Sequence, residues 1–540
     1  MAAAAARRAD ESGAGGALGA ALLAAALSAV LFALDGREGL DLADEGFLWV
    51  GVRETLAGAV PLRDFQSYDP GRYYWAALFG LWLGDGILAL RAAATSFGAL
   101  GLWWGLLVAR RISASPWFLV PCGAVLALWM APRHKAFEPS LALLALLAAV
   151  RLLERPSAGR HAAAGAAVGI AACFGRNHAL YAGLGFALLF LWRGLRLRAP
   201  GVPAGLLAFL AGALAGFAPA LALWALAPGL AASWVDSLLF YLEQGPNHPA
   251  PVPWPWRLDF AALDWLAIQA RLSLGALFLL GALFVPVGLL LAWRTPAGPL
   301  PRRSVVLAAA AIGLFYAHHA SVRSDASHLA QCIHPILLGS LALPGALGRR
   351  HWLAPALTGL WVLTLFALPE VRPALARRLP WVMSEDLEPF DAAGDALALP
   401  RHAARELRQL VSAVEARGEP GDVLFIAPAW PGLYPLLSRR PPVWWTYFLW
   451  PADPETEERL VAALDAAPLR RALLQTGAPF GMDELRFERT HPRVWQHLAA
   501  GLETEAGAAL PPGHRLLVRR SHASQAPGTG APEPRRAPTP

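Results

Sequence analysis

The chain has 540 residues, of which 56% are hydrophobic and only 16% are charged, and its mean hydropathy is +0.42. This composition excludes an ordinary soluble protein and indicates a protein that crosses a membrane several times. The net charge of +7 does not indicate a nucleic-acid partner, because the arginines form short clusters between apolar runs, as in cytoplasmic loops. All three cysteines lie within or beside apolar runs, which argues against a disulfide framework and a thiolate metal site.

Eleven apolar runs follow one another along the chain, and several are close to the lower length limit of about 17 residues for a membrane span. The first run follows Arg7 and Arg8 without a convincing cleavage site, so we interpret it as a signal anchor. The runs lie at residues 16–34, 87–109, 116–131, 139–153, 161–175, 178–192, 203–226, 267–293, 303–319, 331–347 and 351–368.

Arginine clusters alternate with these runs, which predicts the topology. All of them lie in the cytoplasm if about eleven helices span the bilayer, with the N-terminus inside and the C-terminus outside. This topology requires that residues 73–83 do not cross the membrane. Their apolar stretch is too short for a full span. Residues 35–86 are therefore predicted to form one long outer loop with surface helices. The clusters are Arg110–Arg111, Arg151/Arg155/Arg160, Arg193/Arg196/Arg198, Arg294/Arg302/Arg303 and Arg349–Arg350.

The composition changes after Leu368. Residues 370–520 are predicted to form a soluble α/β domain on the outer face, and residues 521–540, rich in Pro, Ala, Gly and Ser, a disordered tail. No glycine-rich phosphate loop accompanies the predicted strands, so the sequence gives no support for a nucleotide site. The strands are predicted at 422–426, 471–475 and 515–518, and the helices near 401–417, 455–467 and 494–502.

The polar residues that could carry chemistry all fall in loops predicted to lie on the outer face. Charged groups that gather on one side of a membrane usually mark a site or a pathway. Carboxylates beside several cations suit a reaction that needs a base and must also hold an anionic leaving group, such as a phosphate. These residues are Asp44, Glu45, Asp64, Asp69 and Arg72; Arg133, His134, Lys135 and Glu138; Arg176, Asn177 and His178; and His318, His319, Arg323, Asp325 and His328.

Each of these residues also has a simpler explanation. Asp44 fits the N-terminal cap of a helix over residues 45–56 about as well as it fits a catalytic role. Any single outer arginine fits a phospholipid headgroup slightly better than a substrate. Lys135 is the only lysine, against 45 arginines (46 basic residues minus this one). Chance explains this as well as function does, because both residue types bind phosphate.

Several stretches together resemble GT-C glycosyltransferases, most of all the bacterial membrane enzymes of the protein O-mannosyltransferase and aminoarabinose-transferase group. Residues 42–47 (LADEGF), 60–65 (VPLRDF) and 68–74 (YDPGRYY) resemble their first outer loop. Residues 174–181 (FGRNHALY) and 323–329 (RSDASHL) are similar to further stretches of such enzymes. The resemblance covers residues 16–368, with a looser likeness of the C-terminal domain.

The resemblance implies a GT-C helical bundle over residues 1–368. This bundle would move a sugar from a polyprenyl-phosphate carrier to a lipid, glycan or protein acceptor on the outer face of the bacterial cytoplasmic membrane. It makes Asp44 the catalytic base, with Glu45 and Glu138 as further catalytic carboxylates. Glu138–Pro139 stands where the family often has Asp-Pro, a departure that lengthens the side chain. The related families differ in metal use, so a divalent metal stays open and no cofactor is assigned.

Such a reaction also agrees with elementary chemistry. An inverting transfer needs a carboxylate that takes the acceptor proton on the face opposite the leaving group, and cations that stabilise the charge developing on the phosphate. The alternative function is a transporter or flippase of lipid or polysaccharide. It would need polar residues through the midplane or paired interrupted helices, and the apolar runs show neither. The predicted substrate and phosphate ligands are Arg72, Arg133, Lys135, Arg176, His178, Arg323, Asp325 and His328.

Overall fold

The computed structural model describes residues 2–198, 201–244, 250–294, 301–382, 385–416 and 422–519. The chain divides into two compact units. The first comprises residues 1–407, 430–438 and 444–447, and the second comprises residues 408–429, 439–443 and 448–540.

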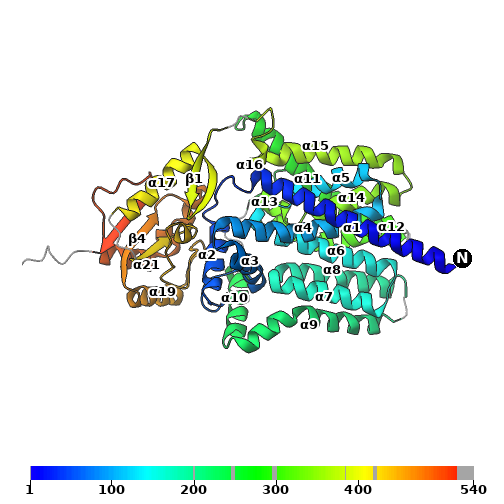
Figure 1. Ribbon diagram of the computed structural model, residues 1–540, viewed down its shortest axis with the longest axis horizontal. Helices are drawn as coiled ribbons and strands as arrows, with labels where there is room; N and C mark the ends of the chain where they lie inside the picture. Colours follow the sequence, from blue (N-terminus) through cyan, green and yellow to red (C-terminus); the bar gives the residue numbers. More distant parts are fainter. Residues whose placement is uncertain are drawn as a thin grey trace, which may run out of the picture. The chain divides into compact units, whose positions relative to one another are not determined.

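The first unit is built around a bundle of long helices that run alongside one another (Figure 1). Its helices and 3-10 turns, in chain order, are α1 (Ala2–Asp35), α2 (Asp44–Leu56), α3 (Pro70–Leu83), α4 (Ile87–Ile112), α5 (Pro116–Leu128), η1 (Arg133–Lys135), α6 (Phe137–Glu154), α7 (Ala158–Phe174), α8 (Arg176–Leu195), α9 (Val202–Leu226), α10 (Leu230–Gln244), η2 (Pro255–Arg257), α11 (Trp265–Arg294), α12 (Pro301–Val322), α13 (Ala326–Ala330), α14 (His334–Ala346), η3 (Arg350–Trp352), α15 (Leu353–Val371) and α16 (Pro373–Ala376).

Each predicted span contains one helix, namely α1, α4 to α9, α11, α12, α14 or α15. Within the described residues, eight of these helices are long and apolar enough to cross a membrane. The others are shorter, with 13 residues in α5 and α14 and 17 in α7. The segment predicted not to cross forms α3, which has 14 residues and is too short to span a bilayer by itself. The prediction of a polytopic helical protein is confirmed.

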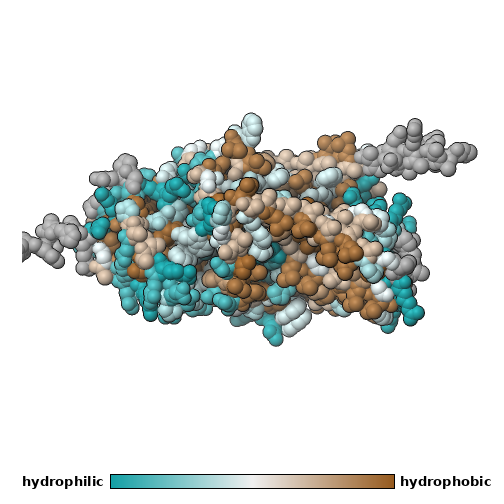
Figure 2. All heavy atoms as spheres, turned by 90° about the horizontal axis from the view of Figure 1, so that it is seen from below, coloured by the Kyte–Doolittle hydropathy of each residue, from teal (hydrophilic) through white to brown (hydrophobic). Residues whose placement is uncertain are grey.

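The bundle carries many apolar side chains on its outside. Leu207, Trp117 and Leu81 are between 69% and 91% exposed. Figure 2 shows a broad band of such hydrophobic side chains along the helices. A soluble monomer rarely exposes so large an apolar area, whereas the hydrocarbon core of a bilayer covers it. The chain is therefore a multi-pass membrane protein.

The arginine clusters meet at one end of the bundle, because successive helices run in opposite directions. The guanidinium of Arg302, at the start of α12, donates two hydrogen bonds to the carbonyl of Ile112, at the end of α4. Arg196, just after α8, likewise donates to the carbonyl of Trp293, near the end of α11. We call this end the arginine end, and the opposite end, where α2 begins, the Asp44 end.

Two segments from late in the chain belong to the Asp44 end of the first unit. The antiparallel hairpin β1 (Leu387–Ala392) and β2 (Asp395–Pro400) bonds to the segment after α1, where Ala398 exchanges backbone hydrogen bonds with Arg37 and Gly39. Helix α18 (Leu433–Leu436) lies against α2.

That second contact needs glycine on both sides. A Cβ on Gly46 would come within 2.5 Å of the Cα of Gly432, so a side chain at Gly46 would push the two segments apart. The backbone N–H of Gly432 also donates to the carbonyl of Leu42 at 2.9 Å. The start of α2 is thus held by the late segment 430–438.

The second unit is a small α/β domain. Its four-stranded sheet has the order β3-β4-β6-β5, in which β3 and β4 are parallel and the other neighbours antiparallel. The strands are β3 (Val423–Ala427), β4 (Leu469–Gln475), β5 (Leu502–Thr504) and β6 (His514–Arg519), and the helices and turns after β3 are α19 (Pro454–Ala466), η4 (Pro479–Gly481), η5 (Asp483–Leu485), α20 (Phe487–Thr490) and α21 (Pro492–Gly501).

The three strands predicted in this domain are confirmed as β3, β4 and β6, and the three helices as α17 (Arg401–Glu415), α19 and α21. The domain boundary predicted at residues 368–370 stays a prediction. The last long bundle helix ends at Val371, and the first compact unit continues to Leu407. The tail predicted at 521–540 lies outside the described residues.

Candidate active site

The carboxylate of Asp44 is accessible at the first residue of α2. The interpretation of Asp44 as the helix cap is wrong, because Ala43 occupies the cap position and the hydrogen bond that the Asp44 carboxylate accepts among the described residues comes from a side chain, the Tyr447 hydroxyl. The carboxylate of Asp41 instead accepts the N–H of Ala43 at 2.9 Å. The Asp44 side chain is 43% exposed, so a substrate can reach its carboxylate oxygens.

Several basic side chains lie around this carboxylate. The Nε2 atom of His134 is 4.0 Å from its Oδ2 atom. Burial raises the pKa of Asp44, but the positive charges of Lys135 and Arg323, with the neighbouring His134, outweigh that effect, and the pKa lies below its ordinary value. His134 is itself buried, which lowers its pKa. Asp44 is therefore an ionised carboxylate at neutral pH, as a general base must be.

A tyrosine from late in the chain also touches Asp44. The hydroxyl of Tyr447 donates to Oδ1 of Asp44 at 3.4 Å. Gln66, in the first loop, fixes this segment, because its Oε1 atom accepts the backbone N–H groups of Thr446 and Tyr447 at 3.0 and 2.9 Å. Burial and the charge of Asp44 raise the pKa of Tyr447 well above its ordinary value, so the hydroxyl stays a donor.

Lys135 is held beside Asp44 by Tyr68. Its Nζ atom donates to the Tyr68 hydroxyl at 2.6 Å and lies 4.0 Å from the centroid of the same ring. Both residues come from stretches that the sequence singled out, the first loop and the segment before α6. An ammonium group has three N–H donors, so Lys135 can hold Tyr68 and still donate to an anion.

Arg323 and Asp325, on the loop between α12 and α13, form one cluster with His328 of α13. The two oxygens of Asp325 accept from Nε of Arg323 at 2.6 Å and from Nδ1 of His328 at 2.9 Å. Burial raises the pKa of Asp325, but the hydrogen bond and charge of His328, with Arg323, lower it overall. The sequence predicted these three residues as substrate ligands, and the structure places them together.

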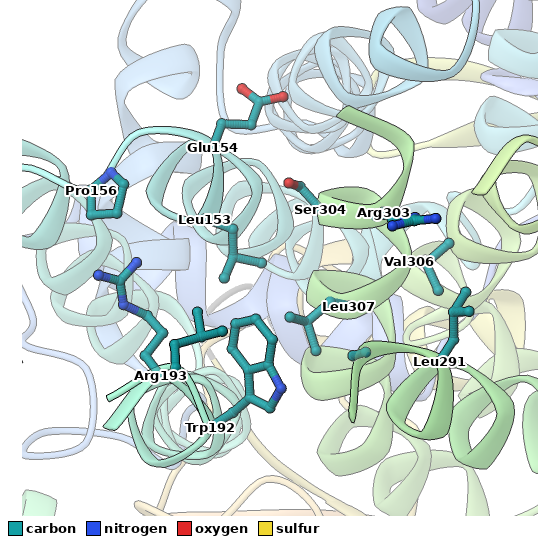
Figure 3. Close-up of a pocket in the computed structure, with 13 residues that line it drawn as sticks. Leu153, Glu154, Pro156, Trp192, Arg193, Leu291, Arg303, Ser304, Val306 and Leu307 are labelled. Atoms are coloured by element: carbon teal, nitrogen blue, oxygen red, sulfur yellow. The ribbon is translucent and has the colours of Figure 1, made fainter. Parts of the chain in front are cut away.

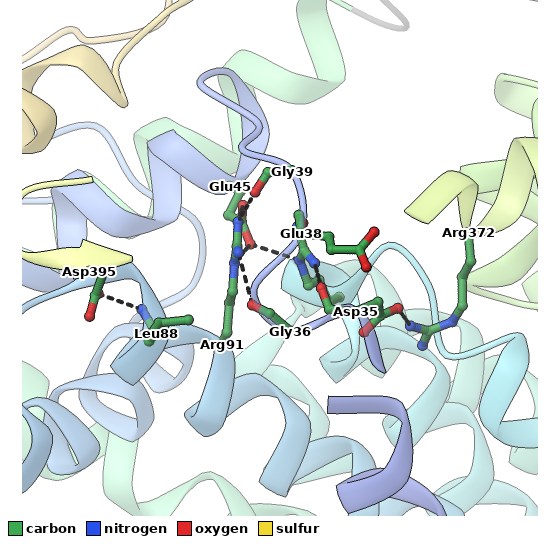
Figure 4. Close-up of polar contacts among 10 residues, drawn as sticks. Asp35, Gly36, Glu38, Gly39, Glu45, Leu88, Arg91, Arg372 and Asp395 are labelled. Carbon is green, nitrogen blue, oxygen red and sulfur yellow. Dashed lines mark hydrogen bonds and ion pairs between the residues drawn. The ribbon is translucent and has the colours of Figure 1, made fainter. Parts of the chain in front are cut away.

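Glu45, the residue after Asp44, lies in a buried ion pair with Arg91 (Figure 4). Its two oxygens accept from Nε and Nη2 of Arg91 at 2.9 and 2.7 Å, and both side chains are 1% exposed. Arg133 contacts the same carboxylate at 3.2 Å. Burial raises the pKa of Glu45, but these two arginines lower it far below its ordinary value. Glu45 thus fixes the start of α2.

The two arginines also hold the segment that joins α1 to α2. Arg91 donates to the carbonyls of Gly36 and Gly39, at 2.9 and 2.8 Å. Arg133 donates to the carbonyls of Asp35 and Glu38, at 2.6 and 2.8 Å. Arg133 is therefore already engaged, which makes it a weaker candidate for a phosphate ligand than Lys135.

Two further buried ion pairs join the first loop to the later ones. Nη1 of Arg72 lies 2.6 Å from Oε1 of Glu138, and Nε of Arg176 lies 2.8 Å from Oδ1 of Asp69. Arg176 also donates to the carbonyl of Trp234 at 2.9 Å. These predicted ligands lie at the Asp44 end but are engaged with one another.

His178 is buried behind these pairs. It is 1% exposed, and neither of its ring nitrogens has a hydrogen-bond partner among the described residues. The same holds for Oε2 of Glu138. His178 contacts the ring of His319, which contacts that of His328, with centroid distances of 5.4 and 5.3 Å. This row of histidines leads from the Asp325 cluster into the interior.

The predicted site residues thus form two groups. In the first group, Lys135 and the Arg323 cluster lie beside the accessible carboxylate of Asp44. The second group consists of buried or partly buried ion pairs that hold the loops, namely Glu45 with Arg91 and Arg133, Glu138 with Arg72, and Asp69 with Arg176. Tyr447, Tyr68 and Gln66 also belong to the site, although the sequence did not predict them as site residues. Within the described residues, no three His, Cys, Asp or Glu side chains form a group that could hold a metal ion.

An apolar groove opens beside the first loop. It has a volume of about 780 Å³ and lies between α3, the end of α7, and α9. One end begins at Pro70 and Gly71, next to Asp69 of the Asp69–Arg176 pair. Its lining includes Tyr74, Leu78, Leu81, Ile170, Ala220, Leu223 and Trp224. The groove has the apolar character that a lipid tail requires.

Comparisons with known proteins agree with this architecture. No protein-family model matches the sequence, and no curated protein matches it. Among solved structures, the chain is similar to ArnT from Cupriavidus metallidurans bound to undecaprenyl phosphate, with a TM-score of 0.50 and 16% identity over 93% of this chain and 98% of that one. The archaeal oligosaccharyltransferase of Archaeoglobus fulgidus has a TM-score of 0.42 and 14% identity over 87% of this chain and 69% of that one. The likeness to ArnT confirms the GT-C fold that the sequence resemblance implied.

Proposed function

We propose that this protein is a membrane glycosyltransferase that moves a sugar from a polyprenyl-phosphate carrier to an acceptor on the outer face of the bacterial cytoplasmic membrane. The observation that carries the proposal is the accessible, ionised Asp44 carboxylate with Lys135 and Arg323 beside it. A carboxylate base and cations for a leaving phosphate are the two requirements of this transfer. The fold of ArnT, solved with undecaprenyl phosphate, supports a carrier of that class.

In this mechanism Asp44 takes the proton of the acceptor group as its oxygen or nitrogen attacks the anomeric carbon. The bond between that carbon and the phosphate oxygen breaks, and its electron pair leaves with the polyprenyl phosphate. Lys135 and Arg323 stabilise the charge on the departing oxygen. Tyr447 orients the base through its hydrogen bond to Oδ1. Glu45 and Glu138, each in a buried ion pair, position the loops rather than exchange protons.

The apolar groove beside α3 is our candidate for the lipid tail of the carrier. Ala220→Trp would fill it, and we expect the KM for a long-chain donor to rise about tenfold or more, since burial of each methylene contributes about 0.8 kcal/mol. The KM for a short-chain donor should change little, because a short tail does not need the whole groove. Initial rates with the two donors make this comparison.

The matched control is Leu283→Trp, which fills a second apolar groove of about 740 Å³ between α11, α14 and α15. This control should leave both KM values unchanged. An equal rise for long and short donors in Ala220→Trp, or a rise in Leu283→Trp instead, would place the tail elsewhere.

The proposal also predicts the orientation of the protein in the membrane, with the arginine end in the cytoplasm and the second unit outside. Ala114, between α4 and α5, and Ser412, on α17, are both exposed. In a variant without the three native cysteines, Ala114→Cys should stay protected from an impermeant thiol reagent in intact spheroplasts, whereas Ser412→Cys should react. Both should react after permeabilisation. The reverse labelling in intact cells would invert the orientation and remove the outer-face site.

A further inference from the structure

A pocket with polar groups among a mostly apolar lining lies at the arginine end, on the opposite end of the bundle from Asp44. It has a volume of about 310 Å³ and is lined by the ends of α6, α8 and α11 and the start of α12. Leu153, Leu197, Leu291 and Leu307 form much of its wall. This volume is at the lower end of the range for small-molecule sites, which is about 300–1,000 Å³.

Two arginines flank this apolar wall. In Figure 3, Arg193 of α8 and Arg303 of α12 lie on either side of Leu153 and Leu307. Arg193 is only 8% exposed. The Nε atoms of both arginines, and Nε1 of Trp192, are buried and have no hydrogen-bond acceptor among the described residues.

Unsatisfied buried donors of this kind call for an explanation. A buried N–H without an acceptor costs about 1–3 kcal/mol, and more when the group is charged. Neighbouring arginines at the same end do have acceptors: Arg302 bonds to the carbonyl of Ile112 and Arg196 to that of Trp293. Among the described arginines at this end, the buried Nε atoms without an acceptor are those of Arg193 and Arg303, which both line this pocket.

One carboxylate, Glu154, also lines the pocket. Its Oε2 atom pairs with Nη2 of Arg111 at 3.2 Å, so its charge is balanced from outside the pocket. Its Oε1 atom is buried and has no donor among the described residues. The pocket thus offers two cationic donors for an anion and one acceptor for a hydroxyl group.

We propose that this pocket binds an anionic phospholipid, whose phosphate is held by Arg193, with Arg303 as a second cation on the other side of the pocket, and whose headgroup hydroxyl donates to Glu154. The leucine wall suits the start of an acyl chain, and Leu197 is 37% exposed, so the wall continues to the outside of the bundle. Basic pockets between membrane helices on the cytoplasmic side bind such headgroups. The site is separate from Asp44 and does not depend on the proposed transfer reaction.

Native mass spectrometry of the delipidated full-length protein tests the proposal. Phosphatidylglycerol should bind at least about tenfold more tightly than phosphatidylcholine. Both lipids carry the phosphate, but only phosphatidylglycerol has a headgroup hydroxyl for Glu154, and choline adds a positive charge beside the two arginines; a hydrogen bond to a charged group contributes about 1.5–3 kcal/mol, and 1.4 kcal/mol is tenfold. Arg193→Gln combined with Arg303→Gln should abolish that preference. Arg196→Gln, on the same helical end but with its own acceptor, should keep it.

One further variant and one competition experiment complete the test. Arg193→Lys retains the charge and should retain most of the preference for phosphatidylglycerol. Melting temperatures of all variants show whether a loss of binding reflects loss of the site or loss of the fold. Millimolar inorganic phosphate should not displace the lipid. Equal binding of the two lipids, an equal loss in Arg196→Gln, or displacement by free phosphate would overturn the proposal.

Discussion

Asp44→Asn should lower the rate of sugar transfer by about two to four orders of magnitude, the usual contribution of a positioned acid or base. The fold should be unchanged, because Ala43 rather than Asp44 occupies the cap position and the Asp44 side chain is 43% exposed. The amide keeps the shape and can still accept from Tyr447, but it cannot take a proton. Turnover of purified protein with a short-chain polyprenyl-phosphate sugar, alongside melting temperature, measures both effects.

Asp41→Asn is the matched control for this prediction. It removes a charge three residues away, in the same loop, while its amide oxygen can still accept the N–H of Ala43. We expect this variant to keep most of the wild-type rate. Near-normal turnover in Asp44→Asn would exclude Asp44 as the base, and an equal loss in Asp41→Asn would mean that local charge rather than proton transfer matters.

Glu45→Gln should destabilise the protein by about 3–5 kcal/mol, the typical effect of removing one partner from a buried ion pair. The substitution leaves Arg91, which is 1% exposed, without its carboxylate and weakens the contact with Arg133. The segment after α1 and the start of α2 should loosen together, because both arginines also hold that segment. Thermal unfolding in detergent should show a clearly lowered Tm.

The control for Glu45 is Asp85→Asn, which breaks an ion pair with Arg53 whose side chains are 56% and 28% exposed. An exposed pair contributes about 0–1 kcal/mol, so its Tm should hardly change. Equal small shifts in both variants would contradict a structural role for Glu45. A normal Tm with greatly reduced turnover in Glu45→Gln would instead assign Glu45 to the chemistry.

Much of the fold was predictable because long apolar runs leave few choices. Each of the eleven runs contains a helix, and α3 is as short as its apolar stretch indicated. The alternation of the runs also predicted that the polar loops would meet at one end. Lys135 and the Arg323 cluster were predicted as site residues because each lies in a loop between two apolar runs on the predicted outer face.

The partners of these residues were harder to predict. The bond between Asp44 and Tyr447 joins positions 403 residues apart, and no local pattern marks such a pair. Arg91 lies near the start of the apolar run 87–109, where nothing in the sequence indicates that it pairs with Glu45. The sequence showed which residues are charged, but not which charges cancel each other. The sequence therefore did not show that Lys135 is a better candidate phosphate ligand than Arg133, Arg176 and Arg72. These three carry the same charge but are engaged in buried or partly buried ion pairs.

The most direct test of the central claim is transfer by the purified protein in detergent, where there is no bilayer to cross. Polyprenyl-phosphate-linked sugars from the native membrane serve as donors and a cell-envelope extract as the acceptor source, with mass spectrometry of both fractions. We predict that wild-type protein converts one loaded carrier to free polyprenyl phosphate and adds that sugar to an acceptor, and that Asp44→Asn does neither. If every loaded carrier stays intact with wild-type protein, while the same protein moves such carriers across reconstituted vesicles, the protein is a transporter and the account is wrong.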